Sequence, residues 1–394
     1  MDVFTKCAEF SRRIDSLKAR RQFFYLREFD PSASPTVAMD GRTLIMLGSN
    51  NYLGLATHPR VVEATVRAVE RYGTGACSSR VLTGTTSLHS ELERRLAEFK
   101  GTEDAVVFSA GFLAMMGTVS AIAGDGDVVL SDELNHASIV EGCRLTSAEV
   151  RIYRHNDMTD LEEKLATCDA SRGKLIVTDG VFSMKGTVAD LPGIKVLADR
   201  YDARIMVDDA HGTGAIGETG RGTLEHFGME GDVDLVCGTF SKSLGTIGGF
   251  AGAPKDVVTF LKLSSRPFIF TASPPPSSMA TVLACLDVLE DEPELMVRLR
   301  NRTGLMRDGL SDLGFRLEKT VTPIIPVLIG DDETTFRMAG ALEDEGVVVN
   351  PIVPPAVPSG ASLIRVSMMA SLSENEIGEA LARFGSVGRK LGVI

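Results

Sequence analysis

The stretch that decides the fold is residues 204–245, which read RIMVDDAHGTGAIGETGRGTLEHFGMEGDVDLVCGTFSKSLG. It holds two short apolar runs, Ile205–Asp208 and Leu235–Cys237, and a loop of small, polar and titratable residues follows each run. Apolar runs of this length, separated by helical patterns, are typical of strands in a parallel sheet that is covered on both faces. Ligands of such sheets bind at the carboxyl ends of the strands, so these two loops predict the functional site.

The same alternation of strand and helix patterns extends on both sides, from about residue 50 to residue 290. It predicts an α/β fold with a mostly parallel seven-stranded sheet and helices on both faces. An uncharged run, Ala105–Gly124, splits into a β-rich start and a helical remainder with glycines, which indicates a buried strand, turn and helix rather than a membrane span. We expect strands at Val106–Ser109, Val128–Ser131, Val150–Tyr153, Leu175–Thr178, Ile205–Asp208, Leu235–Cys237 and Gly249–Ala251, and helices that include Ser87–Phe99, Met158–Ala166 and Ile194–Arg200.

We predict three parts: an N-terminal arm at residues 1–45, a large domain at 46–290 and a small α+β domain at 291–394. The arm reads as a charged helix from about Cys7 to Phe24, a Pro/Ser stretch at Asp30–Pro35 and a short strand pair around residues 39–47. A long helical pattern, Ser277–Glu290, leads into the small domain, where residues 350–360 read as a Pro-rich loop. The other expected elements of this domain are helices at Glu294–Leu313, Phe336–Glu345 and Glu374–Lys390, and strands at Ile325–Ile329, Val347–Asn350 and Leu363–Ser367.

The composition is that of a globular chain, with 394 residues of which 44% are hydrophobic and 24% charged. The 41 basic and 53 acidic residues give a net charge of −12, which repels a phosphate backbone and argues against a nucleic-acid partner. The six cysteines include no C-x-x-C pair, and the charged N-terminus lacks the apolar segment of a signal peptide. We therefore expect a cytoplasmic protein with at most peripheral membrane contact.

Titratable residues recur after the predicted strands. Desolvation beside a buried strand end can turn a lysine such as Lys242 into a nucleophile that forms a Schiff base with a carbonyl compound. Asp208 is placed to pair with the protonated ring nitrogen of a pyridinium cofactor, within reach of His211, and His136 to stack on an aromatic ring. From these residues alone, a solvated loop lysine, an aspartate in a turn and a histidine that caps its own helix remain open alternatives.

Two other patterns point elsewhere. Residues 212–217 match G-x-G-x-x-G after a strand, but the following GETGRG cannot open the helix that a dinucleotide-binding site requires. A metal site built from Asp208, Asp209, His136 and His211 is a minor alternative, since no local spacing supports it.

Taken together, four motifs resemble the α-oxoamine synthases, which are pyridoxal-phosphate enzymes of the type I aminotransferase fold. They are DELNHAS (132–138), DDAHG (208–212), GTFSKSLG (238–245) and IRVSMMAS (364–371). The resemblance runs from NNYLGL (50–55) to the C-terminus. Within the family, FYLREFD (24–30), RPFIFTAS (266–273) and NPIVPPA (350–356) look most like bacterial serine palmitoyltransferases.

The resemblance implies a role for each matching residue. Lys242 would carry pyridoxal 5'-phosphate as an internal aldimine and act as general base, and Asp208 would keep the pyridine nitrogen protonated. Other residues would surround the cofactor and the amino acid: His136 stacked on the ring, His211 and Ser183 at its O3' side, Gly111, Phe112, Thr239 and Ser241 at the phosphate, Thr271 at the phosphate of the neighbouring subunit, Arg365 at the substrate carboxylate, and Asn51 at the border of the substrate.

The implied activity is a decarboxylative condensation of an α-amino acid with an acyl thioester, which yields an α-amino ketone. L-serine with a long-chain acyl-CoA, as in sphingolipid biosynthesis, is the first expectation. Glycine C-acetyltransferase or aminooxononanoate synthase activity, or a carrier-protein thioester in a natural-product pathway, remains the alternative. The resemblance also implies a homodimer with shared active sites.

Overall fold

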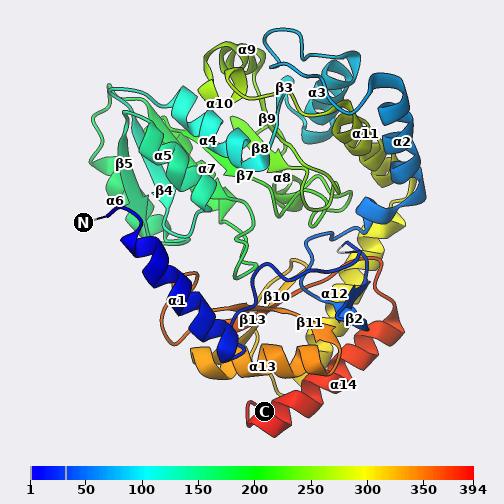
Figure 1. Ribbon diagram of the computed structural model, residues 1–394. Coiled ribbons are helices and arrows are strands. Elements are labelled where there is room, and N and C mark those ends of the chain that lie inside the picture. Colours follow the sequence, from blue (N-terminus) through cyan, green and yellow to red (C-terminus); the bar gives the residue numbers. More distant parts are fainter. Residues whose placement is uncertain (1, 32) are drawn as a thin grey trace. The chain divides into compact units, whose positions relative to one another are not determined.

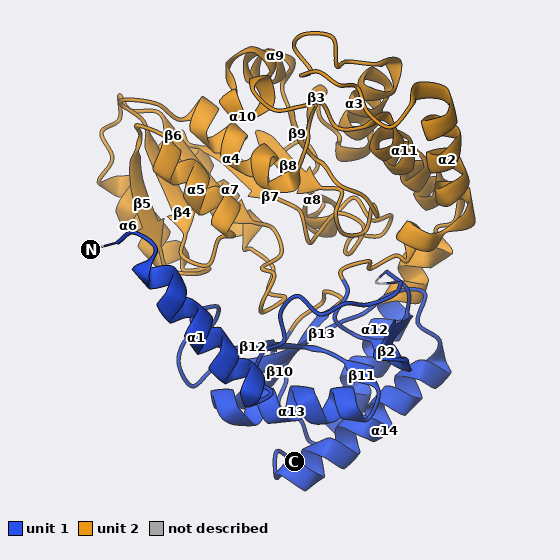
Figure 2. Ribbon diagram, viewed as in Figure 1, with its two compact units in different colours: residues 1–49, 300–319, 324–394 blue, residues 50–299, 320–323 orange. Residues whose placement is uncertain are grey.

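The computed structural model describes residues 2–31 and 33–394 (Figure 1). Ser32, which falls in the Pro/Ser stretch, lies outside the described residues, as does Met1. The chain forms two compact units (Figure 2). Unit 1 comprises residues 1–49, 300–319 and 324–394, and unit 2 comprises residues 50–299 and 320–323.

Unit 2 contains a seven-stranded sheet in the order β3-β9-β8-β7-β6-β4-β5. Strands β8, β7, β6, β4 and β5 pair in parallel, and β9 runs antiparallel to both β3 and β8. This confirms the predicted α/β fold with a mostly parallel sheet. The strands are β3 (Asp104–Phe108), β4 (Val128–Asp132), β5 (Glu149–Tyr153), β6 (Lys174–Asp179), β7 (Arg204–Asp208), β8 (Leu235–Thr239) and β9 (Gly249–Ala253).

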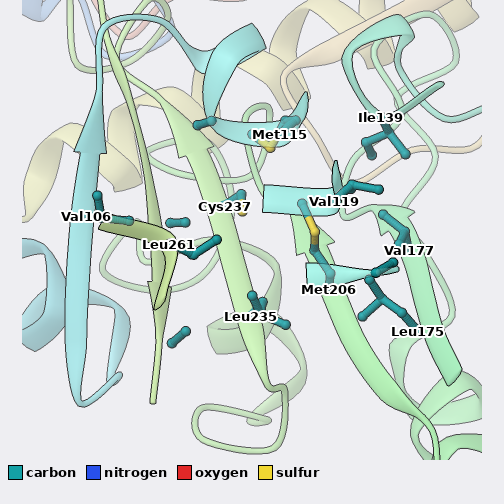
Figure 3. Close-up of a cluster of buried hydrophobic side chains, with 14 of the residues drawn as sticks. Val106, Met115, Val119, Ile139, Leu175, Val177, Met206, Leu235, Cys237 and Leu261 are labelled. Atoms are coloured by element: carbon teal, nitrogen blue, oxygen red, sulfur yellow. The ribbon is translucent and has the colours of Figure 1, made fainter. Parts of the chain in front are cut away.

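Two apolar cores cover the two faces of this sheet, because successive strand residues point to opposite sides. In β7, Met206 belongs to one core, while Ile205 and Val207 belong to the other. Figure 3 shows the first core, in which Met206 and Cys237 lie with Met115 and Val119 of the helix that follows β3. A charged residue in a central strand would have to be buried, so polar side chains collect at the strand ends.

The helices of unit 2 lie on both faces of the sheet. Those that supply the core of Figure 3 are α4 (Gly111–Ile122), α5 (Ala137–Leu145), α9 (Lys255–Ser264) and α10 (Arg266–Ile269). The opposite core receives α6 (Met158–Ala166), α7 (Leu191–Tyr201) and α8 (Thr223–Phe227). The remaining helical elements are a 3₁₀ turn at Leu55–Thr57, α2 (Pro59–Tyr72), α3 (Ser87–Lys100), α11 (Pro276–Asp291) and the first part of α12 (Glu294–Asp312).

Unit 1 combines two three-stranded sheets with helices. One sheet has the order β1-β2-β11 and joins the two ends of the chain, since β11 pairs in parallel with β2. The other has the order β10-β13-β12 and is antiparallel. The elements are α1 (Thr5–Ala19), β1 (Thr36–Met39), β2 (Arg42–Met46), the rest of α12, β10 (Ile324–Gly330), α13 (Asp332–Asp344), β11 (Val347–Val348), β12 (Asn350–Ile352), β13 (Ser362–Ser367) and α14 (Glu374–Leu391).

Three expectations for unit 1 were wrong: one helix end, one helix start and one segment expected to be a loop. Helix α1 ends at Ala19 rather than near Phe24, because Arg21 takes a left-handed φ of 56° and the Gln22 N–H returns to the Leu17 carbonyl. Helix α13 begins four residues early, where the Asp331 side chain accepts the Thr334 N–H. The first residues of the Pro-rich segment form β12 and pair with β13 instead of forming a loop. Among the described helices, none is long and apolar enough to cross a membrane.

Candidate active site

A cavity opens in unit 2 at the carboxyl ends of the central parallel strands. The loops after β6, β7 and β8 line it, together with the N-terminus of α4 and the start of α5. Eight of the residues predicted from the sequence line this cavity, and six of them are Gly111, Phe112, His136, Asp208, His211 and Lys242. Thr239 and Ser241 also line it. The lining therefore mixes one lysine, two carboxylates, two imidazoles and several hydroxyl groups with apolar side chains such as Val181 and Ile247.

Asp208 ends β7 and is 4% exposed. Its carboxylate accepts a hydrogen bond from the Ala210 N–H at 3.0 Å, as an aspartate in a turn does. Burial raises the pKa of Asp208 to about 6, and the positive charge of Lys242 opposes that increase. A buried carboxylate of this kind is stabilised by any cation that enters the cavity.

Asp179 is a second buried carboxylate in the lining, and sequence reasoning missed it. It ends β6 and is 3% exposed. Burial raises the pKa of Asp179 well above its ordinary value, and the nearby charge of Asp208 raises it further. The sequence did contain a signal for this residue, because Asp179 directly follows the apolar run Leu175–Thr178 and so stands at a predicted strand end.

His136 caps α5 and lines the cavity at the same time. Its Nδ1 accepts the Ser138 N–H at 3.2 Å and lies 2.7 Å from the Ser138 hydroxyl. Burial lowers the pKa of His136, and the charge of Lys242 lowers it further, so the ring is held neutral. The capping alternative and the stacking role are therefore compatible, since the cap uses only one ring nitrogen.

The N-terminus of α4 forms a cradle suited to an anion. The helix begins at Gly111, whose N–H and that of Phe112 precede the first intrahelical hydrogen bonds. A Cβ at Gly111 would lie 2.5 Å from the Thr239 hydroxyl oxygen, so only glycine permits this approach. The Thr239 and Ser241 hydroxyls lie 2.9 Å apart beside it. Free N–H groups, hydroxyl donors and the helix dipole together favour a phosphate.

His211 follows Asp208 by three residues and is 8% exposed. Its Nδ1 lies 2.7 Å from the hydroxyl of Tyr52, whose side chain is fully buried. Tyr52 was not among the predicted site residues. A tyrosine followed by Leu-Gly-Leu, as in NNYLGL, is typical of a side chain buried in the core.

A buried ion pair supports the β7 loop from behind. Lys100, the last residue of α3, donates to Asp209 at 2.7 Å, and both side chains are at most 2% exposed. Asp209 also accepts from the Thr213 hydroxyl and from the N–H and hydroxyl of Thr223. The chain from Asp209 to Gly222 forms turns, and no helix begins before Thr223. Asp209 therefore fixes the loop that carries Asp208 and His211, and the G-x-G-x-x-G match does not open a helix.

The other predicted residues lie outside the lining. Asn51 is 6% exposed and its side-chain oxygen accepts the Ala56 N–H at 3.4 Å. Ser183 follows the lining residue Val181 in the loop after β6, and Thr271 precedes the bridge between Ser79 and Ala272. Arg365 lies on β13 of unit 1, is 4% exposed, and donates to the Ser367 hydroxyl at 2.8 Å. Among residues 2–31 and 33–394, no cluster of His, Cys, Asp and Glu side chains could hold a metal ion.

Comparison with known proteins identifies the family. A model of class I and II aminotransferases matches residues 42–384. Serine palmitoyltransferase of Sphingobacterium spiritivorum is 45% identical over 370 residues, which is 94% of this chain and 93% of that protein. 8-Amino-7-oxononanoate synthase 1 of Bacillus velezensis is 43% identical over 381 residues, 97% of each chain. The structure of a serine palmitoyltransferase variant from S. paucimobilis with bound PLP–myriocin aldimine superposes over 100% of both chains, with 36% identity and a TM-score of 0.95.

The chain thus belongs to the class I and II aminotransferase family. Within this family it is an α-oxoamine synthase, that is, a pyridoxal-phosphate-dependent acyltransferase, as are both kinds of relative.

The residues in the cavity fit that cofactor. The Gly111–Thr239 cradle would hold its phosphate, the buried Asp208 would face its protonated nitrogen, and Lys242 offers the amine that binds its aldehyde.

Proposed function

We propose that this enzyme condenses L-serine with a long-chain acyl thioester, expelling the free thiol and releasing carbon dioxide and a 3-keto long-chain base. The 45% identity to a serine palmitoyltransferase over almost the whole chain carries this proposal. Because 8-amino-7-oxononanoate synthases reach 43% identity, a shorter amino acid or a different acyl thioester remains the second candidate. Sphingolipid biosynthesis in the cytoplasm is part of the proposal.

Each cavity residue has a place in the proposed chemistry. When bound, pyridoxal phosphate supplies an electron sink for the carbanion at the amino acid's Cα. Asp208 would hold the proton on the pyridine nitrogen of the cofactor, and neutral His136 would stack on the ring without adding charge. The α4 N-terminus, Thr239 and Ser241 bind the phosphate, while His211 and Ser183 act at the O3' side.

Lys242 performs the proton transfers. Its Nζ would remove the Cα proton of the amino acid and would return a proton after loss of carbon dioxide. The positive charge of Lys242 opposes the increase in the pKa of Asp179 and of Asp208, which line the same cavity. Arg365 clamps the substrate carboxylate through its planar guanidinium, and Asn51 borders the substrate.

We also propose a homodimer in which Thr271 reaches the phosphate of the partner's site. In unit 2, several large apolar side chains near Thr271 and the cavity are exposed: Leu82 at 77%, Phe270 at 75% and Ile247 at 57%. The Ser79–Ala272 bridge ties the segment of Leu82 to that of Phe270 and Thr271. Large apolar side chains this exposed favour a second copy of the chain as the covering partner.

The experiment is a matrix of amino acids against acyl thioesters. Serine, glycine and alanine are each paired with acetyl-CoA, pimeloyl-CoA, palmitoyl-CoA and palmitoyl carrier protein, and mass spectrometry scores carbon dioxide loss and product mass. We expect turnover to be highest with serine and palmitoyl-CoA. A clear preference for alanine with pimeloyl-CoA, or for glycine with acetyl-CoA, would replace the substrate assignment and leave the reaction class intact.

A further inference from the structure

We propose that His155 is a positioning residue. Its ring joins the buried carboxylate of Asp132 to the hydroxyl of Thr187, and it thereby fixes residues 180–189, which we call the β6 hairpin and whose Val181 lines the cavity. These hydrogen bonds involve no cofactor, and only their consequence for catalysis rests on the proposed function.

The β6 hairpin leaves the sheet directly after β6 and borders the cavity. Val181 and Val188 form an antiparallel bridge. The Phe182 N–H donates to the Thr187 carbonyl at 2.9 Å. The hairpin places Val181 in the apolar wall of the cavity, and it also carries Ser183, which the resemblance assigns to the O3' side of the cofactor. A movement of the hairpin would therefore move this wall.

The hydrogen bonds of His155 run from a strand end to the hairpin. Its Nδ1 lies 3.1 and 3.2 Å from the two carboxylate oxygens of Asp132. Those oxygens also accept the N–H groups of Leu134 and Asn156, which suits an ionised carboxylate, so Nδ1 carries the proton and donates. In the neutral ring Nε2 then accepts, and the Thr187 hydroxyl, 3.1 Å away, is its donor.

Packing around the same ring strengthens the attachment. The rings of His155 and Phe182 meet edge to face, with centroids 4.3 Å apart. Asp132 and Phe182 are both buried, so bulk water competes weakly for these contacts. The next residue, Asn156, donates from its side-chain amide to the Val188 carbonyl at 3.0 Å. Residues 155 and 156 thus hold both strands of the hairpin.

Carboxylate, imidazole and hydroxyl in this order also make up a nucleophilic triad. Within residues 2–31 and 33–394, however, the lining of the cavity includes none of Asp132, His155 and Thr187. The three side chains therefore act on the hairpin and not on a reacting group. A firmly held hairpin keeps the wall at Val181 in place, so that cofactor and substrate meet a cavity of constant shape.

Hydrogen exchange in the cofactor-free protein is the direct test. Thr187→Val removes the hydroxyl with little change in shape, while the hairpin stays attached at Gly186, whose carbonyl accepts the Thr320 hydroxyl at 2.7 Å. Loss of one net hydrogen bond should make the amides of the β6 hairpin exchange about fivefold faster, with β7 and β8 unchanged. Thr187→Ser keeps the hydroxyl and should exchange as wild type does. Unchanged exchange in Thr187→Val, or equal exchange in the valine and serine variants, would overturn the proposal.

A double-mutant cycle assigns the effect to His155. His155→Phe keeps an aromatic ring but removes both nitrogens, and it should speed exchange of the hairpin at least as much as Thr187→Val. Adding Thr187→Val to His155→Phe should have no further effect, because the two changes remove the same bond. Additive effects would show that the hydroxyl does not act through His155. The matched control is Thr65→Val on α2, another half-buried threonine, whose hydroxyl bonds that of Thr281 at 2.6 Å. It should leave the hairpin unchanged.

The cofactor-loaded protein gives a second readout, measured with the amino acid and thioester that the wild type prefers. In Thr187→Val the induced circular dichroism of bound pyridoxal phosphate should weaken and kcat should fall about fivefold, and Thr187→Ser should restore both. A hairpin that exchanges faster with unchanged dichroism and kcat would show that it does not position the site. If serine and palmitoyl-CoA do not react, the proposed function fails, whereas the exchange and dichroism results still decide the role of His155.

Discussion

Asp179 and Asp208 are register partners on the adjacent parallel strands β6 and β7, so two buried carboxylates end side by side on the floor of the cavity. Burial raises the pKa of both carboxyl groups, and the charge of Asp208 raises the pKa of Asp179 further. The two buried carboxylates destabilise the fold of the cofactor-free protein, and they stabilise a cation that enters the cavity. A protonated pyridine nitrogen is such a cation, so the pair is suited to the cofactor and to Lys242.

This relationship predicts that Asp208→Asn stabilises the cofactor-free protein. The pKa of Asp208 is about 6 in the folded state against an ordinary value of 3.8, so ionisation destabilises the fold at pH 8 by about 3 kcal/mol. The sign follows because the folded state binds the proton more tightly, and the cost appears as pH rises from about 4 through 6. Urea unfolding should show Asp208→Asn to be more stable by about 1–3 kcal/mol at pH 8 and unchanged at pH 3.5. The exposed Asp125→Asn serves as the control, and equal gains at both pH values would contradict the electrostatic explanation.

Lys242 is predicted to be the residue that binds the cofactor covalently. Reduction with borohydride followed by peptide mapping should place the pyridoxyl group on Lys242. Lys242→Ala should lose the visible band and fail to exchange the Cα proton of serine, a loss of at least about a thousandfold in rate. Lys255→Ala, at an exposed lysine on α9, should behave as wild type. Labelling of any other lysine would remove the proposed mechanism.

Gly111→Ala should weaken cofactor binding. The added Cβ would meet the Thr239 hydroxyl oxygen at 2.5 Å and would separate α4 from the loop after β8. Overpacking of this kind costs about 1–3 kcal/mol, which corresponds to about a fivefold to 150-fold higher Kd for pyridoxal phosphate. Gly378→Ala on α14 is the control, because a Cβ there meets no atom within 4 Å. Fluorescence titration measures both, and an unchanged Kd in Gly111→Ala would argue against the anion cradle.

Lys100→Met should destabilise the fold strongly. It would leave Asp209 buried without its cation, and breaking a buried pair from one side costs about 3–5 kcal/mol. The double variant Lys100→Met/Asp209→Asn should recover part of this loss, because the unpaired charge is gone. Denaturant midpoints of the single and double variants check the prediction. A loss below about 1 kcal/mol in Lys100→Met would show that water reaches Asp209.

Mixed dimers test the proposed sharing of active sites. Lys242→Ala and Thr271→Ala protomers, each inactive or weak alone, should regain activity when hybrids form, because one of the two sites then contains both wild-type residues. Differently tagged protomers allow the hybrid to be purified before the assay. Hybrids that form but stay as inactive as the parents would place Thr271 outside the partner's site.

Much of the large sheet was predictable because its signals are local. Each parallel strand is buried on both faces, so β4, β6, β7 and β8 appear as short apolar runs, and the structure confirms each of them to within two residues. The loops that end these runs carry Lys242, Asp208, His211 and His136, and one sheet edge brings all four to one cavity. Two expected elements were wrong: α1 ends early because Arg21 takes a positive φ, and residues 350–352 form β12 because they pair with β13 farther along the chain.

By itself, the sequence determined the succession of strands and helices along the chain and the polar residues at the strand ends, since periodicity and strand-end chemistry are written along it. The type I fold followed from the resemblance of its motifs to the α-oxoamine synthases. Only the tertiary structure decided which distant side chains meet. Asp179 and Asp208, which pair across two strands, are 29 positions apart in the sequence. The hydrogen bond between Tyr52 and His211 spans 159 positions, and the ion pair between Lys100 and Asp209 spans 109. The order of the strands within the sheet and the packing of the loops set those contacts, and neither is encoded in the local pattern of any one segment.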